Sequence, residues 1–335
     1  MKKLSKFAVT LLTLISFSFS GVAEDENKII HTTKFSPALV EYAANGNHIA
    51  QNTLGIVYLK GLGTDADVSK AVYWFNLSAE GDNSSGMCNL GACYLKGNGV
   101  AQDFARAAEL FEKAAMLDHQ AAIFNLATMY SKGQGVAKDP KQAFDFALKA
   151  ANYNKKSGVV DEDGRDDSQA VTGRAEMFVA TCYMMGTGVE PNPGKAIEFC
   201  RRAAGNENPP AAMIMGVYSY LGNRVPRNLA DAERYLKVAS DGGITQAQYM
   251  LGRCYASGEG FGKNTDNARK YLTLALDNNQ SLPPMMKADA LLKLADILEN
   301  TGSEDDKSLA AGYRSQAASL PAPDQAVIEK MLFEE

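Results

Sequence analysis

Residues 90–115 read "LGACYLKGNGVAQDFARAAELFEKAA", and this stretch decides the fold. In its first part Leu90 and Tyr94 lie four residues apart, as they would on one face of a helix. Gly97 and Gly99 then end that helix, because glycine readily adopts the left-handed backbone conformation of a helix stop. The remaining residues carry alanines and larger apolar residues at helical spacing. The stretch therefore predicts two helices joined by a glycine turn.

The same pattern occurs six times along the chain. Its marker is a small residue directly after an apolar one, and it recurs at intervals of 36, 36, 53, 36 and 36 residues: Gly55, Gly91, Ala127, Ala180, Gly216 and Gly252. An alanine follows each marker at an offset of sixteen: Ala71, Ala107, Ala143, Ala196, Ala232 and Ala268. A large apolar residue comes three positions later: Trp74, Leu110, Phe146, Phe199, Tyr235 and Tyr271. Such a regular offset indicates an internal repeat.

The first unit shows how each repeat would pack. Ala50, Leu54 and Tyr58 form one apolar stripe on the first helix, and Ala71 and Trp74 mark the inward face of a second, antiparallel helix. A unit of two helices cannot bury its apolar face alone. Neighbouring units must therefore stack, and the sequence predicts an all-α solenoid.

The pattern A-x-x-x-L-G-x-x-Y-x-x-G-x-G-V, followed by K-A-x-x-W/Y/F-x-x-x-A-A, resembles the Sel1-like repeat family, whose two-helix repeats are related to tetratricopeptide repeats. The resemblance covers residues 36–320 and implies a right-handed α/α solenoid. We expect units near 50–81, 86–117, 122–153, 175–206, 211–242 and 247–278, with a degenerate seventh at 288–320. Residues 24–35 would form a linker, and 321–335 a tail or capping helix.

Two features of the later units depart from the simple pattern. In the fifth unit Ser219 replaces the repeat tyrosine and Arg224 replaces a turn glycine, so we expect local differences in packing. In the sixth unit "YASGEGFGKN" at 255–264 resembles a phosphate loop. A loop of the form G-x-x-x-x-G-K-[ST] would need glycine at 257 and a hydroxyl at 264, whereas the chain has Ser257 and Asn264. The glycines are the sixth copy of the turn, so no nucleotide or other cofactor is predicted.

The N-terminus has the pattern of a bacterial signal peptide. Three lysines precede an uncharged run from Phe7 to Ser20, and small Gly21 and Ala23 precede an acidic segment. We predict cleavage after Ala23 and export to the periplasm or beyond. No later segment is apolar enough to span a membrane, and the net charge of −5 gives no reason to expect nucleic acid as a partner.

The long interval adds 17 residues between the third and fourth units, within an acidic stretch at about 154–174. Its position between a second helix and the next first helix predicts a surface loop. The acidic spacing does not match a calcium-binding hand loop, so no metal is predicted there.

The sequence offers little catalytic chemistry. The three histidines lie in different segments, and no serine has a lysine three residues later, so we predict no enzyme, no catalytic residue and no metal site. Cys93, Cys182 and Cys254 occupy a core position of the repeat. Only Cys182 and Cys200, on antiparallel helices around one turn, are placed so that they could form a disulfide.

The first helices of a helical solenoid usually line its binding groove. Helical geometry exposes positions on either side of the marker, which are polar or basic in the first three units and mostly apolar in the next three. The predicted groove residues are Thr53, Lys60, Asn89, Lys96, Asn125, Lys132, Phe178, Met185, Ile214, Leu221 and Met250. The lysines could instead favour the negative end of each helix, and the apolar group could pack under the insertion or under the C-terminal cap.

A lysine series followed by an apolar strip would suit an extended peptide with an acidic end and hydrophobic anchors. We therefore predict an exported, non-enzymatic scaffold or adaptor that binds a protein or peptide, a class that the resemblance also implies. Two alternatives stay open. Cysteine-rich members of the family are linked to penicillin binding or β-lactam hydrolysis, and aromatics near Phe178, Tyr218 and Tyr220 could bind a glycan.

Overall fold

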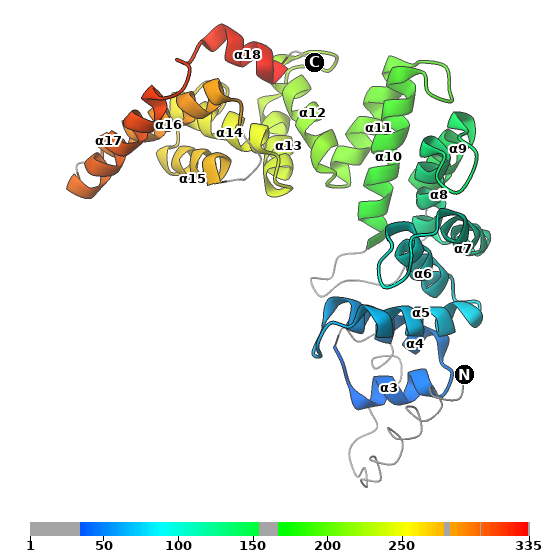
Figure 1. Ribbon diagram of the computed structural model, residues 1–335. Coiled ribbons are helices and arrows are strands. Elements are labelled where there is room, and N and C mark those ends of the chain that lie inside the picture. Colours follow the sequence, from blue (N-terminus) through cyan, green and yellow to red (C-terminus); the bar gives the residue numbers. More distant parts are fainter. Residues whose placement is uncertain (1–33, 154–166, 278–281, 302, 334–335) are drawn as a thin grey trace.

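The computed structural model describes residues 34–153, 167–277, 282–301 and 303–333. Within these ranges the chain forms sixteen helices and no strand (Figure 1). The predicted signal peptide and most of the predicted linker lie outside the described residues. None of the described helices is both long and apolar enough to cross a bilayer.

Twelve of the helices form six antiparallel pairs. The first helix of each pair, called the A helix below, is α4 (His48–Lys60), α6 (Ser84–Lys96), α8 (Gln120–Lys132), α10 (Asp167–Met185), α12 (Pro209–Leu221) or α14 (Thr245–Ser257). The B helices are α5 (Val68–Glu80), α7 (Phe104–Met116), α9 (Pro140–Ala151), α11 (Pro193–Gly205), α13 (Leu229–Asp241) and α15 (Thr265–Asp277). The stack begins with α3 (Pro37–Ala44) and continues into α16 (Pro284–Glu299) and α17 (Glu304–Ala318), with α18 (Gln325–Phe333) last.

The repeat sequence fixes both ends of each hairpin. The A helices stop at glycines in the left-handed conformation, as at Gly61 (φ 70°) and Gly97 (φ 70°). Each B helix begins at an Asp or Asn whose side chain accepts a hydrogen bond from a backbone N–H in the first turn, as Asp103 does from Arg106 at 2.9 Å. This capping satisfies donors that a helix start otherwise leaves unpaired.

The marker residue of each A helix lies against the B helix of the same repeat. A Cβ atom added to Gly55 would lie 2.5 Å from the ring of Phe75, and one added to Gly252 would lie 2.6 Å from Leu272. The residue twenty positions beyond the marker is large where the marker is glycine: Phe75, Phe111, Leu236 and Leu272. It is small where the marker is alanine: Ala147 and Cys200. A larger side chain on one helix is thus matched by a smaller one on the other, so the two helices stay in close contact in every repeat.

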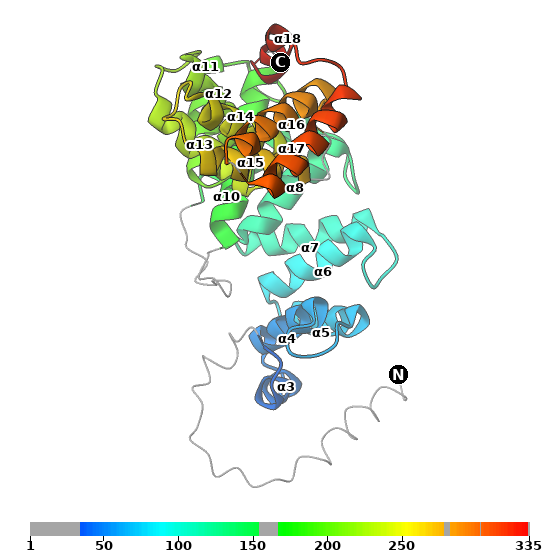
Figure 2. The same cartoon turned by 90° about the vertical axis from the view of Figure 1, so that its left-hand side faces the viewer.

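The hairpins pile up in chain order, and each helix packs mainly against its sequence neighbours. Figure 1 shows the stack rising from α3 to α9, turning near α10 and α11, and running on to α17, and Figure 2 shows the same arrangement from the side. One buried cluster runs through all six pairs, from Ala71 to Tyr271. The predicted all-α solenoid is confirmed.

The insertion lengthens α10. The sequence predicted a surface loop over about 154–174, but residues 167–174 form the first two turns of α10, so the loop prediction is wrong for this part; residues 154–166 lie outside the described residues. The extra helix is anchored at its base. Glu176, buried in α10, accepts hydrogen bonds from Arg202 at 2.8 Å and Asn206 at 2.7 Å.

Arg202 also donates to the carbonyl of Ala151 at 3.0 Å, at the end of α9. One guanidinium therefore joins α9, α10 and α11 across the point where the repeat is interrupted. Burial raises the pKa of the Glu176 carboxyl, and the bonds from Asn206 and Arg202 oppose this effect.

We expect Gly55→Ala to destabilise the fold by about 1–3 kcal/mol, because the new methyl group must displace the Phe75 ring. Gly312→Ala in α17 is the matched control, since a Cβ there meets no atom within 4 Å. Without a clash, alanine should stabilise that helix by up to about 1 kcal/mol. Urea unfolding followed by circular dichroism measures both values. If Gly55→Ala left the free energy of unfolding unchanged, the close packing described above would be contradicted.

We expect Arg202→Met to cost about 3 kcal/mol, because it leaves the Glu176 carboxylate buried without its charged partner. The double variant Glu176→Leu/Arg202→Met removes both charges and should recover most of that loss. Thermal unfolding of the two variants checks this. If the single and double variants were equally stable, the ion pair would not be what joins the two parts of the stack.

Candidate partner-binding surface

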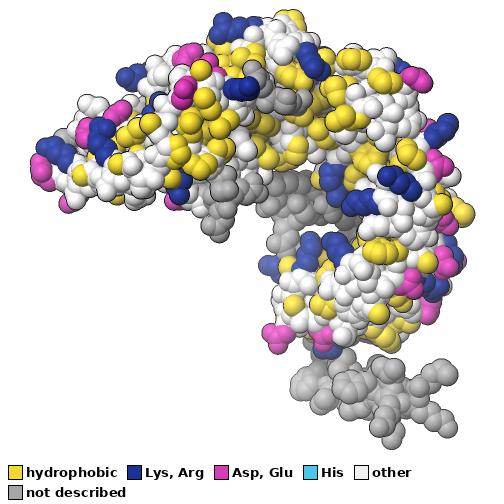
Figure 3. Space-filling view, turned by 45° about the horizontal axis from the view of Figure 1, so that its top comes forward, with side chains coloured by type: hydrophobic (Ala, Val, Ile, Leu, Met, Phe, Trp, Pro, Cys, Tyr) yellow, Lys and Arg dark blue, Asp and Glu magenta, His cyan; other side chains and the backbone are white. Residues whose placement is uncertain are grey.

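The predicted groove residues lie on or at the ends of the A helices, and the surface these helices present is called the A-helix face below. Figure 3 shows that the molecule is hooked, with many hydrophobic side chains over the arm formed by the C-terminal helices. The A-helix face has a polar part over α4, α6 and α8 and an apolar part over α10, α12 and α14.

The polar part is organised by side chains from adjacent repeats. Asn89 of α6 donates a hydrogen bond to the side chain of Asn52 of α4 at 2.8 Å. Thr53 of α4 and Asn125 of α8 are half-buried. Three lysines end the A helices of these repeats and are exposed: Lys60, Lys96 and Lys132. None of them forms an ion pair with a residue that the structure describes. Within the described part of the chain, no carboxylate pairs with these three charges.

The apolar part begins at α10. Phe178 is half-buried and packs edge-to-face against Phe124 of α8, with ring centroids 6.4 Å apart. Ile214 of α12 is also half-buried. Met185 and Leu221 hold the positions that Lys132 holds in the third repeat, and they are 72% and 40% exposed. Large exposed apolar side chains at corresponding positions of adjacent repeats are typical of a contact surface.

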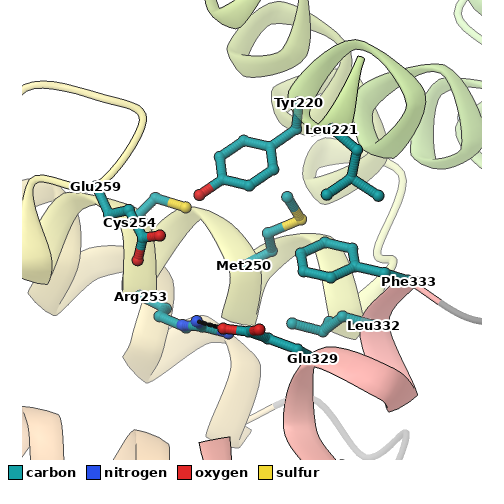
Figure 4. A pocket seen from close by; sticks show the side chains of 9 residues that line it. All are labelled: Tyr220, Leu221, Met250, Arg253, Cys254, Glu259, Glu329, Leu332 and Phe333. Atoms are coloured by element: carbon teal, nitrogen blue, oxygen red, sulfur yellow. Dashed lines mark hydrogen bonds and ion pairs between the residues drawn. The ribbon is translucent and has the colours of Figure 1, made fainter. Parts of the chain in front are cut away.

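Met250 corrects the predicted exposure, because its side chain is only 1% exposed. The C-terminal helix α18 covers it, which is one of the two alternatives left open for the apolar group. Figure 4 shows Met250 facing Leu332 and Phe333 of α18, with Tyr220 and Leu221 of α12 on the other side. The contact leaves a cavity of about 160 Å³ between α12, α14 and α18.

Two specific contacts hold α18 in place. Glu329 pairs with Arg253 of α14 at 3.0 Å, and the Phe333 ring stacks on Tyr220 of α12 with centroids 6.0 Å apart. Ile328 is fully buried against the last repeats. Residues from the fifth repeat and from the end of the chain are thus brought together.

The residues that receive α18 depart from the repeat pattern, which is the signal that could have identified them. Arg253 follows the marker Gly252, where the other repeats have Ile56, Ala92, Thr128, Thr181 and Val217. Phe261 replaces the valine of the second to fifth repeats and lies 6.1 Å from Tyr220, centroid to centroid. Tyr220 directly follows Ser219, the residue that stands where the other repeats have their tyrosine. These departures converge on one place.

The histidines and acidic residues are also residue types that can bind a metal ion. Among the described residues no three His, Cys, Asp or Glu side chains lie together as a metal site. His119 accepts a hydrogen bond from the backbone N–H of Ala122 at the start of α8, so it caps a helix.

The possible disulfide between Cys182 and Cys200 is absent, since both are free, buried thiols. The physical reason is orientation: Cys200 donates to the carbonyl of Ala211 at 3.7 Å and so faces the next repeat. Burial raises the pKa of Cys88 to about 12 and that of Cys182 and Cys254 to about 11. These thiols stay protonated near neutral pH.

We expect the folded protein to react very slowly with Ellman's reagent at neutral pH, because thiolate is the reactive form and all five thiols are buried. Unfolding in guanidinium should release all of them. Peptide mapping of the unreduced protein should show no peptide that joins positions 182 and 200. A fast phase in the native protein would contradict the burial described here.

Comparison with known proteins identifies relatives of this architecture. A Sel1 repeat family model matches residues 48–83, 84–119, 120–152, 173–208, 209–244 and 245–280, well over half of the chain. The chain is 40% identical over 53 residues to the sel1-like repeat-containing protein L21 of Acanthamoeba polyphaga mimivirus, which is 16% of this chain and 10% of that protein.

Two solved structures share the fold. One is a protective antigen present in uropathogenic Escherichia coli strains, which displays an SLR fold; it has a TM-score of 0.55 and 26% identity, and the match covers 84% of this chain and 56% of the antigen. The other is a Sel1 repeat protein from Oxalobacter formigenes, with a TM-score of 0.60, 24% identity, and coverage of 71% and 92%. The chain thus spans about half of the antigen and a tenth of the viral protein.

Proposed function

The chain belongs to the Sel1 repeat family, and on that basis we propose that it is an exported, non-enzymatic adaptor that binds a protein or peptide on its A-helix face. Proteins of this family generally bind other proteins, and their solenoids typically act as scaffolds without enzymatic activity. A stacked array of hairpins offers a long surface on which residues from successive repeats contact one extended ligand.

The observation that carries the proposal is the change of character along this face. Lys60, Lys96 and Lys132 are exposed without an ion-pair partner among the described residues, and Met185 and Leu221 continue the same positions as exposed apolar side chains. A ligand with an acidic segment followed by hydrophobic anchors matches both parts. The charges would speed and orient its association, and the apolar contacts would hold it.

Export is the second part of the proposal and is supported by the sequence alone. The basic, apolar and small-residue segments of the first 23 residues follow the order of a signal peptide. The exported compartment limits the partner to proteins or peptides that reach it.

The partner itself can be found by chemical cross-linking of intact cells that produce the full chain, followed by affinity capture and mass spectrometry. The proposal expects cross-links from the A helices to one or a few exported proteins. Cross-links confined to the B helices would argue against the A-helix face as the binding surface.

For the partner so identified, we expect Lys96→Glu with Lys132→Glu to weaken binding by about tenfold, because two attractive contacts become repulsive. The control is Lys113→Glu with Lys149→Glu, which places the same charge change in the last turns of the B helices α7 and α9 and also removes the exposed ion pair of Lys149 with Asp118. Titration by surface plasmon resonance compares the two. Equal losses in both variants would indicate a general charge effect and would refute the lysine contact.

A further inference from the structure

The C-terminal helix α18 lies where the proposed partner surface is most apolar. It reaches back from α17 across α14 to α12, so that Phe333 contacts Tyr220, a residue far earlier in the sequence (Figures 1 and 4). It covers Met250 and the side chain of Arg253. One segment of the chain therefore already occupies part of the A-helix face.

α18 has the form of a ligand helix. Ile328 and Leu332 are four residues apart and buried, Glu329 pairs with Arg253 beside them, and Met331 on the other side is exposed. Helices that dock into grooves use this spacing of apolar anchors. Residues 319–324 lie outside the helices and include two prolines, so α18 is joined to α17 by a connection without regular secondary structure.

The packing of α18 is incomplete. A cavity of about 160 Å³ remains between it and the A helices, lined by Tyr220, Met250 and Cys254 among others. Its backbone approaches neighbouring helices less closely than the helices of a repeat approach each other. Leu221 lines this cavity and is exposed, as is Met185 at the equivalent position of α10. A longer or better-fitting helix would contact more of this surface.

Arg253 specifies what such a helix must carry. Its side chain is only 10% exposed, and the ion pair it makes is with Glu329 of α18. Removing α18 would take away the carboxylate that this guanidinium contacts and would leave Asp289 and Glu259 as the acidic side chains around it. Loss of a partly buried ion-pair partner is unfavourable. A replacement helix without a carboxylate at this position would bind poorly, whereas one with a carboxylate would restore the pair.

We propose that α18 is an intramolecular occupant of this groove, and that the partner carries an acidic amphipathic helix that displaces it and pairs a carboxylate with Arg253. This inference rests on the proposed function and specifies the partner chemistry at the apolar end. The lysines of the first three repeats lie beyond that end and would receive acidic residues that follow the helix. Binding is reduced by the fraction of molecules in which α18 is docked.

The test uses the full mature chain and a labelled synthetic peptide of residues 321–335 as the model acidic helix. Glu329→Arg in the chain places two cations together and should release α18 without substituting a core residue, because Glu329 itself is exposed. Fluorescence anisotropy should show the peptide binding this variant roughly tenfold or more tightly than it binds the wild type. Met331→Arg, the same new charge on the exposed side of α18, is the matched control and should bind like the wild type.

A charge exchange tests the Arg253 contact directly. The peptide carrying Glu329→Arg should fail to bind the Glu329→Arg chain but should bind a chain carrying Arg253→Glu. Equal binding of the unmodified peptide to the wild-type, Glu329→Arg and Arg253→Glu chains, or no binding to the Glu329→Arg chain, would overturn the proposal.

Thiol labelling gives an independent readout of release and folding. Cys254 lines the cavity beneath α18, whereas Cys93 holds the same repeat position in α6, away from α18. Iodoacetamide labelling of Cys254 should rise in the Glu329→Arg chain while Cys93 stays unlabelled. Unchanged labelling of Cys254 would mean that α18 does not detach and would refute displacement.

These measurements need only the chain and the peptide, so they fail independently of the lysine variants. Failure of peptide binding rejects α18 as an occupant and leaves the lysine surface untouched. Unchanged partner affinity in the Lys96→Glu/Lys132→Glu chain rejects the lysine surface. The role of α18 is then still decided by the peptide assay alone.

Discussion

The close contact between the marker residue of each A helix and the B helix of the same repeat is the constraint on which the rest of the structure depends. Gly55 against Phe75 and Gly252 against Leu272 bring two helices so near that no Cβ fits between them. The resulting hairpin has an apolar flank that only another hairpin can cover. The stack, its order along the chain and the common orientation of the A helices all follow from this contact. So does the existence of one continuous surface formed by equivalent positions.

Much of this could be predicted from the sequence, because the residues that make the local contacts recur at the same positions in several repeats. The helices, the turn glycines and the solenoid are confirmed, since each depends on residues within one hairpin or its neighbour. Features that depend on distant contacts were predicted wrongly or only as one of several alternatives. Residues 167–174 extend α10, where Thr172 accepts a hydrogen bond from Gln120 of α8 at 2.7 Å. Met250 is buried because α18 returns from the end of the chain. No periodicity encodes such a return.

Departures from the repeat therefore carry the most specific information. Arg253, Phe261 and Tyr220 differ from the residues at the same positions of the other repeats. Arg253 and Tyr220 contact α18, and Phe261 packs against Tyr220. The lysines differ in kind, because they recur in three successive repeats and form a regular series. The A-helix face thus joins a regular charged part, which many acidic ligands could approach, to an irregular apolar part with one buried cation. The second part is where selectivity among partners would arise.

Hydrogen–deuterium exchange of the full chain, with and without its captured partner, tests the central claim most directly. Binding on the A-helix face predicts slower exchange in α8, α10 and α12, together with faster exchange in α18 as it is displaced. Exchange in the B helices should change little. Slower exchange confined to α7, α9, α11 and α13, with α18 unaffected, would contradict both the binding surface and the role of its intramolecular occupant.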